Sequence, residues 1–352
     1  MRYMLKETKS DLVVDILIYL MAFLLAIALG AFLIWFLLKI NPFSALSIIV
    51  SSSLFTPIGL SSTFEYLVPL TLISLGLAIS YRAKYWNIGA DGQLIFGAIF
   101  TMQAIFSVKN YVIWPGLAIL FVLIMGILGG ALYGLIPAVL KAKLNVNEVL
   151  STLMLNFIAI YFMTWLVDVT GPWKDPYAAE LESYPIPYKF YLENPLILLS
   201  IIIISIFLIY LLAEKTPFGR YLKILGSSKN TADYIGLNKT LTYIYLGLIS
   251  GALSGLAGAL QILSISHILS SDFDSIYLGY LSIFSTWLSA LNPLYVVFSS
   301  LLMSVLITGG YFMAGIAGVS QLFIYYFEGV TFVSIIVFQA LKHRFKKVIK
   351  NE

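Results

Sequence analysis

The sequence has few charged residues, no cysteine and only two histidines, and each shortage excludes a class of protein. Charged residues make up 11% of the 352 residues and hydrophobic residues 60%, whereas soluble domains carry about 25% charged residues. Without cysteine there is no disulfide, thiolate metal site or cysteine nucleophile. His267 and His343 lie too far apart in the sequence to form a spaced metal motif. We therefore expect a chain solvated mainly by lipid, with no metal and no cofactor.

Motifs for energy conversion and hydrolysis are missing as well. The sequence contains no G-x-x-x-x-G-K-[ST], so it cannot hydrolyse ATP through a P-loop. It contains no H-E-x-x-H and no G-x-S-x-G, so a membrane protease or esterase has no support. No apolar run carries the row of ionisable residues that proton or sodium coupling usually needs. We expect a protein that is not an enzyme and that, as a transporter, would use a partner's energy.

Long apolar runs are what the sequence does have. A bilayer core of about 30 Å requires roughly 20 helical residues. The first run is longer than a signal-peptide core of about 7–15 residues, so we expect it to be retained. The sequence predicts an all-α polytopic membrane protein with about ten transmembrane helices. The ten runs are 13–38, 64–81, 88–107, 112–140, 147–167, 195–213, 242–263, two within 277–308 separated at Asn292-Pro293, and 319–341.

Two further features concern residues between these runs. Residues 43–62 are apolar but rich in serine, with Pro57 and Gly59, which favours a re-entrant or interfacial segment. Residues 168–194 are polar and form the longest loop on one face.

The distribution of basic residues predicts the orientation. With the N-terminus in the cytoplasm, 17 of the 21 Lys and Arg residues fall in cytoplasmic segments. The exceptions are Lys39, Lys109, Lys174 and Lys189. This bias is the one that the positive-inside rule describes. We expect a multi-pass protein of the cell membrane with both termini in the cytoplasm.

An inverted repeat is also expected. The polar stretch 214–241 separates six expected spans from four, and five plus five remain if the sixth span is counted with the second half. The two halves then have opposite orientations, as in many transporters. The two halves share no residue pattern, so the prediction of a repeat rests on the number of spans and on their orientation. We treat residues 1–352 as a single transmembrane domain.

Stretch 214–241 is a basic island between two apolar runs. Tyr221, Ile224 and Leu225 recur in it at helical spacing, which favours one or two short amphipathic helices. The stretch could fix topology through its charge, or it could be a docking surface for a soluble partner. Its basic residues are Lys215, Arg220, Lys223, Lys229 and Lys239.

Polar residues gather at two expected helix starts. In YWNIGADGQLIFG (85–97), Asn87 is a good N-cap and Asp91 suits the first turn. Gly89, Gly92 and Gly97 allow another backbone to approach closely. This stretch is either a capped helix start with tight packing or a part of a solute passage.

The second of these helix starts is KLNVNEVLSTLMLN (143–156). Asn147 and Glu148 begin a span there, and Asn156 lies deeper in it. A polar group facing lipid is costly, so Asn156 should face protein or a cavity. Asn156 and Gln261, near the outer end of another span, either bond neighbouring helices or line a pathway. Gly251, Gly255 and Gly258 predict a close helix-packing face.

Three segments together resemble a known family. WNIGADGQ (86–93) is similar to an NIGAEGQ signature with Asp91 in place of Glu, and KLNVNEVLSTLMLNFIA (143–159) is similar to an NEV-x-[ST]-x-M-LN pattern. GSSKNTADYIGLN (226–238) resembles a permease coupling motif. The chain thus resembles permease subunits of ATP-binding-cassette importers of the branched-chain amino acid/sugar/nucleoside superfamily, above all the nucleoside and simple-sugar permeases.

The resemblance implies a half-transporter for a nucleoside or related simple sugar that works by alternating access. Its implied partners are a second permease, identical or different, two cytoplasmic ATP-binding subunits that hydrolyse ATP, and an extracytoplasmic substrate-binding lipoprotein. It makes 214–241 a cytoplasmic coupling loop. The implied coupling residues are Gly219, Arg220, Gly226, Ala232, Tyr234, Gly236 and Leu237, with Gly226 expected at a bend. The signature residues are Asn87, Gly89, Asp91, Gly92, Gln93 and Glu148. The candidate pathway residues are Gln93, Asn147, Asn156 and Gln261.

The sequence departs from the family pattern in two places. Lys229 stands where the coupling motif usually has proline, and Ser227 where an acidic residue is common. In 279–291, Trp287 is among the residues that replace small ones, which bears on substrate handling. Two other classes stay open: a self-sufficient secondary carrier for a small polar solute, and an intramembrane enzyme or scaffold.

Overall fold

The computed structural model describes residues 41–111, 114–273 and 277–317, with ten isolated positions outside these ranges: 28, 32, 35, 36, 39, 329, 330, 333, 334 and 337. The chain divides into two compact units. One is Glu65–Met303, and the other combines Met1–Phe64 with Ser304–Glu352. The expected spans 13–38 and 319–341 lie outside the continuous described ranges.

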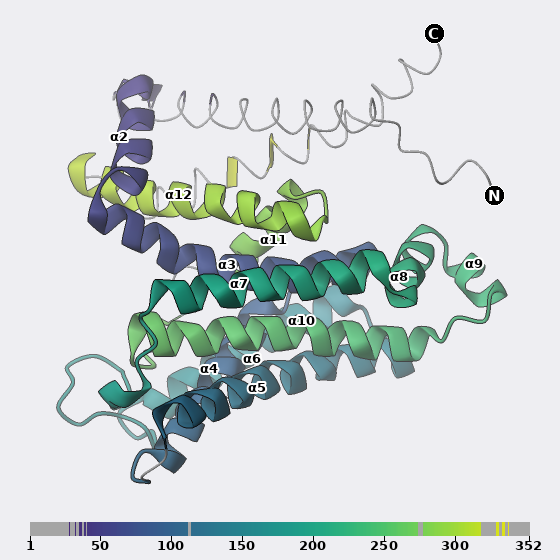
Figure 1. Cartoon of the computed structure of the whole chain (residues 1–352), viewed down its shortest axis with the longest axis horizontal. Coiled ribbons are helices and arrows are strands. Elements are labelled where there is room, and N and C mark those ends of the chain that lie inside the picture. The colour runs from purple at the N-terminus through teal and green to yellow at the C-terminus, as the bar shows by residue number, and fades with distance from the viewer. Residues whose placement is uncertain are drawn as a thin grey trace. The chain divides into compact units, whose positions relative to one another are not determined.

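All the named elements of the described residues are helices (Figure 1). Two π-helical turns, Leu211–Lys215 and Ile262–Ser266, extend α7 and α10. In these ranges no named strand occurs, and the only bridges join Lys174 to Ser183 and Glu182 to Ser270. The α-helices are α2 (Pro42–Leu54), α3 (Pro57–Arg82), α4 (Ala90–Val108), α5 (Pro115–Leu144), α6 (Glu148–Val167), α7 (Pro195–Tyr210), α8 (Pro217–Ser227), α9 (Lys229–Tyr234), α10 (Lys239–Gln261), α11 (Leu278–Leu288) and α12 (Pro293–Ala317).

Within the described part of the chain, seven helical segments are long and apolar enough to cross a membrane. They contain α3, α4, α5, α6, α7, α10 and α12. This confirms an all-helical, multi-pass membrane protein, but it does not reach the expected count of ten. The expected eighth span contains α11, whose 11 residues extend about 16 Å at 1.5 Å per residue. A helix of that length does not cross a bilayer core by itself.

The expected re-entrant segment at 43–62 is wrong in its boundaries. Residues 42–54 form the separate helix α2, and α3 begins at Pro57, seven residues before the expected start of that span at 64. The serines of this stretch misled the prediction. Ser53 bonds the carbonyl of Ile49 in the preceding turn at 2.6 Å, so its hydroxyl is satisfied inside the helix.

Asparagine begins four of the helices. Asn41, Asn147, Asn194 and Asn238 are the N-caps of α2, α6, α7 and α10, and the side chain of each accepts a hydrogen bond from a backbone N–H of the first turn. Those N–H groups have no partner within the helix, which is why asparagine is favoured at this position. Asn41 and Asn194 are followed by proline, which lacks an N–H and suits the first helical residue.

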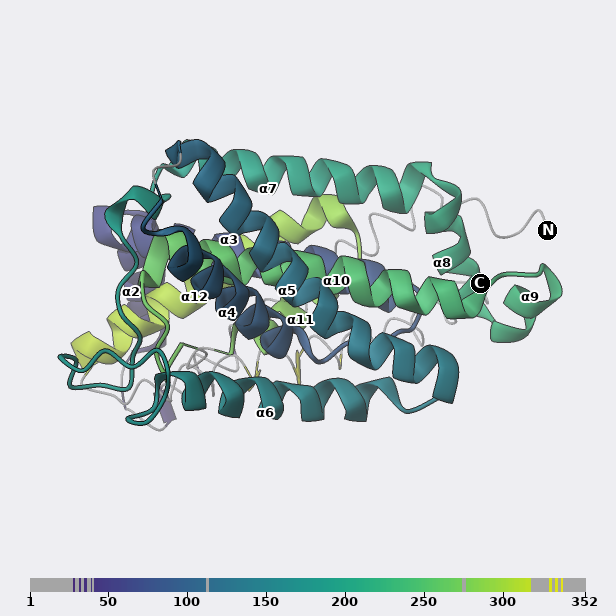
Figure 2. The ribbon, with the colours of Figure 1, turned by 90° about the horizontal axis from the view of Figure 1, so that it is seen from below.

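Glycines bring α4, α5 and α10 into backbone contact, and Figures 1 and 2 show α5 and α10 side by side. A Cβ atom on Gly130 of α5 would collide with the carbonyl oxygen of Gly251 on α10. Gly255 approaches both Gly126 of α5 and Gly97 of α4 in the same way. The expected packing face at 251–258 is therefore confirmed. Because water is absent from a bilayer core, this close van der Waals packing holds the helices together.

The two polar loops lie at opposite ends of the helices of the Glu65–Met303 unit. Helices α8 and α9 lie where α5 ends and α10 begins, and the 168–194 loop lies at the other end (Figures 1 and 2). This arrangement agrees with the expected placement of 168–194 and 214–241 on different faces.

We predict that Gly130→Ala destabilises the protein by about 1–3 kcal/mol, as overpacked cores do, because the new methyl group meets the backbone of α10. Gly116→Ala in the same helix is the control, since nothing lies within 4 Å of a Cβ there. Thermal unfolding in detergent measures both. Equal midpoints for the two variants would contradict the close contact.

Candidate functional site

Residues 83–89 leave the helical conformation between α3 and α4 and fold back along the last turn of α3. The N–H of Tyr85 donates to the carbonyl of Ser80 at 3.1 Å, and the Tyr81 hydroxyl donates to the carbonyl of Asn87 at 2.9 Å. This path carries Asn87 to Ser250, which lies eleven residues beyond the start of α10. An unwound segment thus lies among helices, and its backbone groups need partners there.

A buried amide cluster forms at this point from Asn87, Gln93 and Ser250. The Asn87 Nδ2 atom donates to Ser250 Oγ at 2.7 Å and to Gln93 Oε1 at 3.1 Å. Gln93 Nε2 returns a bond to Asn87 Oδ1 at 3.2 Å. All three side chains are buried. The prediction that Asn87 is an N-cap is wrong, because Gly89 is the N-cap of α4. Asn87 Oδ1 instead accepts a hydrogen bond from the Gly89 N–H.

Helix α6 supplies side chains that bind the unwound backbone directly. Thr152 Oγ1 accepts from the N–H of Ile88 at 3.1 Å. Asn156 accepts from the N–H of Gly92 at 2.8 Å and donates to the carbonyl of Ile88 at 2.9 Å. The expectation that Asn156 faces protein is confirmed, since it is fully buried. Gly92 is required here, because a Cβ would press on Asn156 and Tyr133.

The N-termini of α4 and α11 meet at Asp91. The Asp91 Oδ1 atom lies in the first turn of α4 and accepts from the Gly279 N–H, in the first turn of α11, at 2.5 Å. The next residue, Tyr280, accepts from Asn156 Nδ2 at 3.0 Å. A helix N-terminus carries partial positive charge and favours a carboxylate. One buried carboxylate therefore complements two helix ends at once.

Aromatic rings adjoin the amide cluster. The Trp86 and Trp287 rings stack with centroids 5.5 Å apart, and the Tyr81 ring lies 5.1 Å from that of Trp86. Trp86 directly precedes Asn87, and Trp287 lies in the last turn of α11. Both indoles are half-buried, so each retains some accessible surface.

The expected coupling residues divide between an inner and an outer side. Gly219 and Gly226 of α8 and Ala232 of α9 are buried, whereas Arg220 and Gly236 are exposed, Leu237 is half-buried, and Tyr234 is 93% exposed. Gly226 does not form the expected bend. It lies inside α8 against the carbonyl of Arg82, and the chain changes direction at Ser228, the N-cap of α9.

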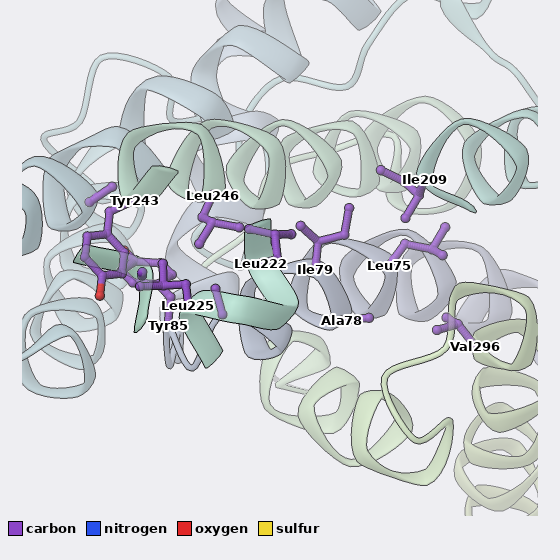
Figure 3. Close-up of a cluster of buried hydrophobic side chains, with 13 residues drawn as sticks. Leu75, Ala78, Ile79, Tyr85, Ile209, Leu222, Leu225, Tyr243, Leu246 and Val296 are labelled. Carbon is purple, nitrogen blue, oxygen red and sulfur yellow. The ribbon is translucent and has the colours of Figure 1, made fainter. Parts of the chain in front are cut away.

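Apolar packing holds α8 on the transmembrane helices. Leu222 and Leu225 of α8 lie in one buried cluster with Ile79, Tyr85 and Leu246 (Figure 3). These partners belong to α3, to the unwound segment and to α10. The opposite side of α8 is polar, as expected from the helical spacing in 214–241.

The other predicted residues lie away from the amide cluster. Asn147 is exposed and caps α6, and Glu148 pairs with Lys141 of α5 at 2.8 Å. Gln261 is buried in α10, eleven residues beyond Ser250, which is about 16 Å along a helix. Among the candidate pathway residues, only Gln93 and Asn156 therefore bond residues of the 86–93 segment, namely Asn87 and Gly92.

Sequence reasoning missed four contributors: Ser250, Gly279, Tyr280 and Arg82. In the sequence, Ser250 is one of several small residues of a helix-packing face, and Tyr280 is one of many aromatic residues in the apolar runs. Neither position indicates a polar contact. Arg82 was counted only for topology, although an arginine ending a long apolar helix is a candidate for a structural ion pair. Its partner Glu214, at 2.6 Å, comes from a distant part of the chain.

Comparison with known proteins gives a consistent match. A family profile described as "Branched-chain amino acid transport system / permease component" matches residues 59–338. The chain is 27% identical over 307 residues to the nucleoside ABC transporter permease protein NupB of Lactococcus lactis subsp. cremoris (strain MG1363), covering 84% of this chain and 83% of that protein.

Two further relatives match over a shorter segment or at lower identity. The guanosine ABC transporter permease protein NupP of Bacillus subtilis (strain 168) is 28% identical over 215 residues, covering 56% of this chain and 58% of the relative. The glucose ABC transporter permease protein TsgB13 of Haloferax volcanii is 25% identical over 295 residues, covering 78% and 74%.

We predict that Asn156→Leu lowers the free energy of unfolding by about 3 kcal/mol, since buried backbone groups at Ile88 and Gly92 lose their partner. Gln103→Leu, at an exposed position of α4, is the control and should change stability little. Thermal unfolding in detergent compares the two. A stable Asn156→Leu protein would show that Asn156 does not hold the unwound segment.

Proposed function

The chain belongs to the permease-component family of branched-chain amino acid transport systems, and on that premise we propose that it is the membrane-spanning subunit of an ATP-binding-cassette importer for a nucleoside or related simple sugar. As a permease component it is a transport subunit rather than an enzyme. The named activities of NupB, NupP and TsgB13 support the choice of substrate class. In this proposal the solute crosses by alternating access, and a separate subunit hydrolyses ATP.

The observation that carries the substrate class is the buried junction at Asp91. Where unwound segments meet helix N-termini in transporters, those positive ends often bind an anionic substrate group. Here both N-termini already face the Asp91 carboxylate. The groups beside it are the neutral amides of Asn87, Gln93 and Asn156. This chemistry favours an uncharged solute with many hydrogen-bonding groups over an amino acid with its own carboxylate.

The aromatic rings favour a nucleoside within that class. Trp86 and Trp287 are half-buried next to the amide cluster. Indole faces stack well on nucleobases, which all have a π-face. Trp287 also belongs to the stretch in which this sequence departs from the family pattern. We assign the pathway to Gln93 and Asn156, with Asn147 and Gln261 as outlying candidates at its two ends.

The expected inverted repeat is also part of the proposal. Helix α3, residues 83–89 and α4 make a helix–unwound segment–helix unit, and α10 and α11 make a second pair of helices, between which the described residues 267–273 and 277 are not helical. The first unit corresponds to the second and third expected spans, and the second unit corresponds to the seventh and eighth. These are equivalent positions in two halves of five spans each. Their second helices meet by their N-termini at Asp91 and Gly279. We propose ten crossing segments, of which the eighth contains α11.

We further propose that the N- and C-termini and the 214–241 loop lie in the cytoplasm of a cell-membrane protein. The loop docks an ATP-binding subunit through its outer side, where Arg220 and Tyr234 are exposed. The polar 168–194 loop then faces an extracytoplasmic binding lipoprotein. A second permease, identical or different, completes the pathway.

The test of this function is uptake in proteoliposomes that contain the whole complex. The wild type should take up radiolabelled guanosine only when ATP is supplied, and leucine should not compete. Uptake that follows an ion gradient with this chain alone would support a secondary carrier instead. Competition by leucine at concentrations similar to guanosine would contradict the substrate class.

We predict that Asn156→Leu reduces guanosine uptake per inserted protein about tenfold or more, the effect of losing at least one buried hydrogen bond in the pathway. Gln103→Leu should leave uptake unchanged, since its side chain is exposed on α4. Normalising to the amount of inserted protein separates transport from folding. Unchanged uptake in Asn156→Leu would remove this residue from the pathway.

We predict that Tyr234→Ala weakens binding of the ATP-binding subunit, because a 93% exposed aromatic side chain is a strong contact in an interface. Tyr177→Ala is the matched control, since Tyr177 is 94% exposed in the 168–194 loop. Gly236→Val should act in the same direction as Tyr234→Ala, because Gly236 directly follows the C-cap residue of α9 with φ +71° and valine adopts that conformation poorly. Co-purification measures docking. Equal retention in all variants would contradict this role of the loop.

A further inference from the structure

Arg82 contacts more segments of the chain than a residue that only sets the orientation in the membrane would need to. Its side chain is 10% exposed, and its guanidinium Nη1 atom contacts Glu214 Oε1 at 2.6 Å. Its Nε atom donates to the carbonyl of Leu291 at 2.9 Å. Glu214 lies in the π-helical turn after α7, and Leu291 lies in the turn between α11 and α12. One side chain at the end of α3 thus holds two other segments.

The docking helix α8 is attached to the same residue. A Cβ on Gly226 would collide with the Arg82 carbonyl oxygen, so α8 lies directly on the backbone of Arg82. Lys223 of α8 also pairs with Glu214, at 2.8 Å, through the carboxylate oxygen that Arg82 leaves available. Helix α8 therefore contacts the Arg82–Glu214 pair through both backbone and side chain.

The turn that Arg82 holds has an unusual backbone. Ala290 and Leu291 have φ values of 52° and 60°, a region that residues other than glycine adopt when their surroundings fix them. The Leu291 carbonyl accepts the Arg82 Nε bond in that conformation. The bond therefore contributes to fixing the C-terminal end of α11.

Both routes from Arg82 lead to the start of α4. The unwound segment begins directly after Arg82 and carries Asn87. The first turn of α11 contains Gly279 and Tyr280, which bind Asp91 and Asn156. A displacement of α8 that moves Arg82 would act on the start of α4 from both sides.

We propose that Arg82 is a positioning residue that transmits movement of the docked α8 helix to α11 and to the unwound segment 83–89. The proposal rests on the proposed function. Arginine suits the role because its planar, branched donor group contacts the Leu291 carbonyl and the Glu214 carboxylate together. A lysine ammonium is a point charge on a flexible stem and does not hold two partners in fixed geometry.

The first test compares Arg82→Met with Lys143→Met in the reconstituted complex. The measured quantity is guanosine taken up per ATP hydrolysed. Arg82→Met should lower this ratio about tenfold, a typical allosteric coupling, while ATP hydrolysis continues. Lys143→Met is the control, because Lys143 is exposed in the last turn of α5 and lies outside the 214–241 loop.

Arg82→Lys keeps a charge beside Glu214 but loses the second contact, so its ratio should fall between those of wild type and Arg82→Met. Arg82→Lys also takes the place of Arg82→Met in this test if Arg82→Met fails to insert into the membrane. An Arg82→Lys ratio equal to wild type, or equal losses in Arg82→Met and Lys143→Met, would overturn the proposal.

The second test does not depend on the substrate. The chain contains no cysteine, so Ser227→Cys on α8 and Leu294→Cys at the start of α12 can carry a spin-label pair at exposed positions. In the complex, the distance distribution should be narrow in the wild-type background, with and without trapped ATP, and should broaden in Arg82→Met. The Lys143→Met background should resemble wild type.

An unchanged distribution in Arg82→Met would overturn the proposal. If the wild-type complex imports no guanosine, the proposed function is contradicted, whereas the spin-label result still decides the role of Arg82. The two failures are therefore distinguishable.

Discussion

The constraint on which this structure depends is the need to satisfy an unwound backbone inside an apolar bundle. Within a bilayer core no water is available to bond a free N–H or C=O group, so non-helical backbone persists only where protein supplies the partners. Residues 85–92 obtain theirs from Ser80, Tyr81, Thr152 and Asn156. The primary role of the polar side chains among these helices is thus to bond the unwound backbone. Binding of a solute can only be a second role of the same side chains.

Much of the fold could be predicted because the longest apolar runs are bounded by strong signals. Asn194 with Pro195, and Asn147 with Glu148, mark helix starts that the structure confirms. The glycines at 251–258 indicate a packing face for the same local reason. The short α11 could not be found in this way, because the run 277–291 contains no charged residue and no proline although only 278–288 is helical.

The site was only partly predictable, since its contacts join distant segments. Asn156 could be assigned to the protein interior because a lone amide in an apolar run has few other places to go. Its partners Ile88, Gly92 and Tyr280 carry no signal for that contact. The error at Asn87 has a similar origin. A favoured capping residue stands two positions before Gly89, but tertiary bonds to Gln93 and Ser250 use its side chain instead.

The glycine contacts between α5 and α10 have a mechanical consequence. Where Gly130 meets the Gly251 carbonyl, backbone touches backbone, and neither helix has side chains that could change rotamer to accommodate a shift. Such a pair behaves as a fixed frame. Helix α11 has one such contact with α4, where a Cβ on Gly279 would collide with the backbone nitrogen of Asp91, and it reaches α6 through the side-chain hydrogen bond between Tyr280 and Asn156. A shift between helices that meet through glycine must therefore move whole helices and not side chains alone.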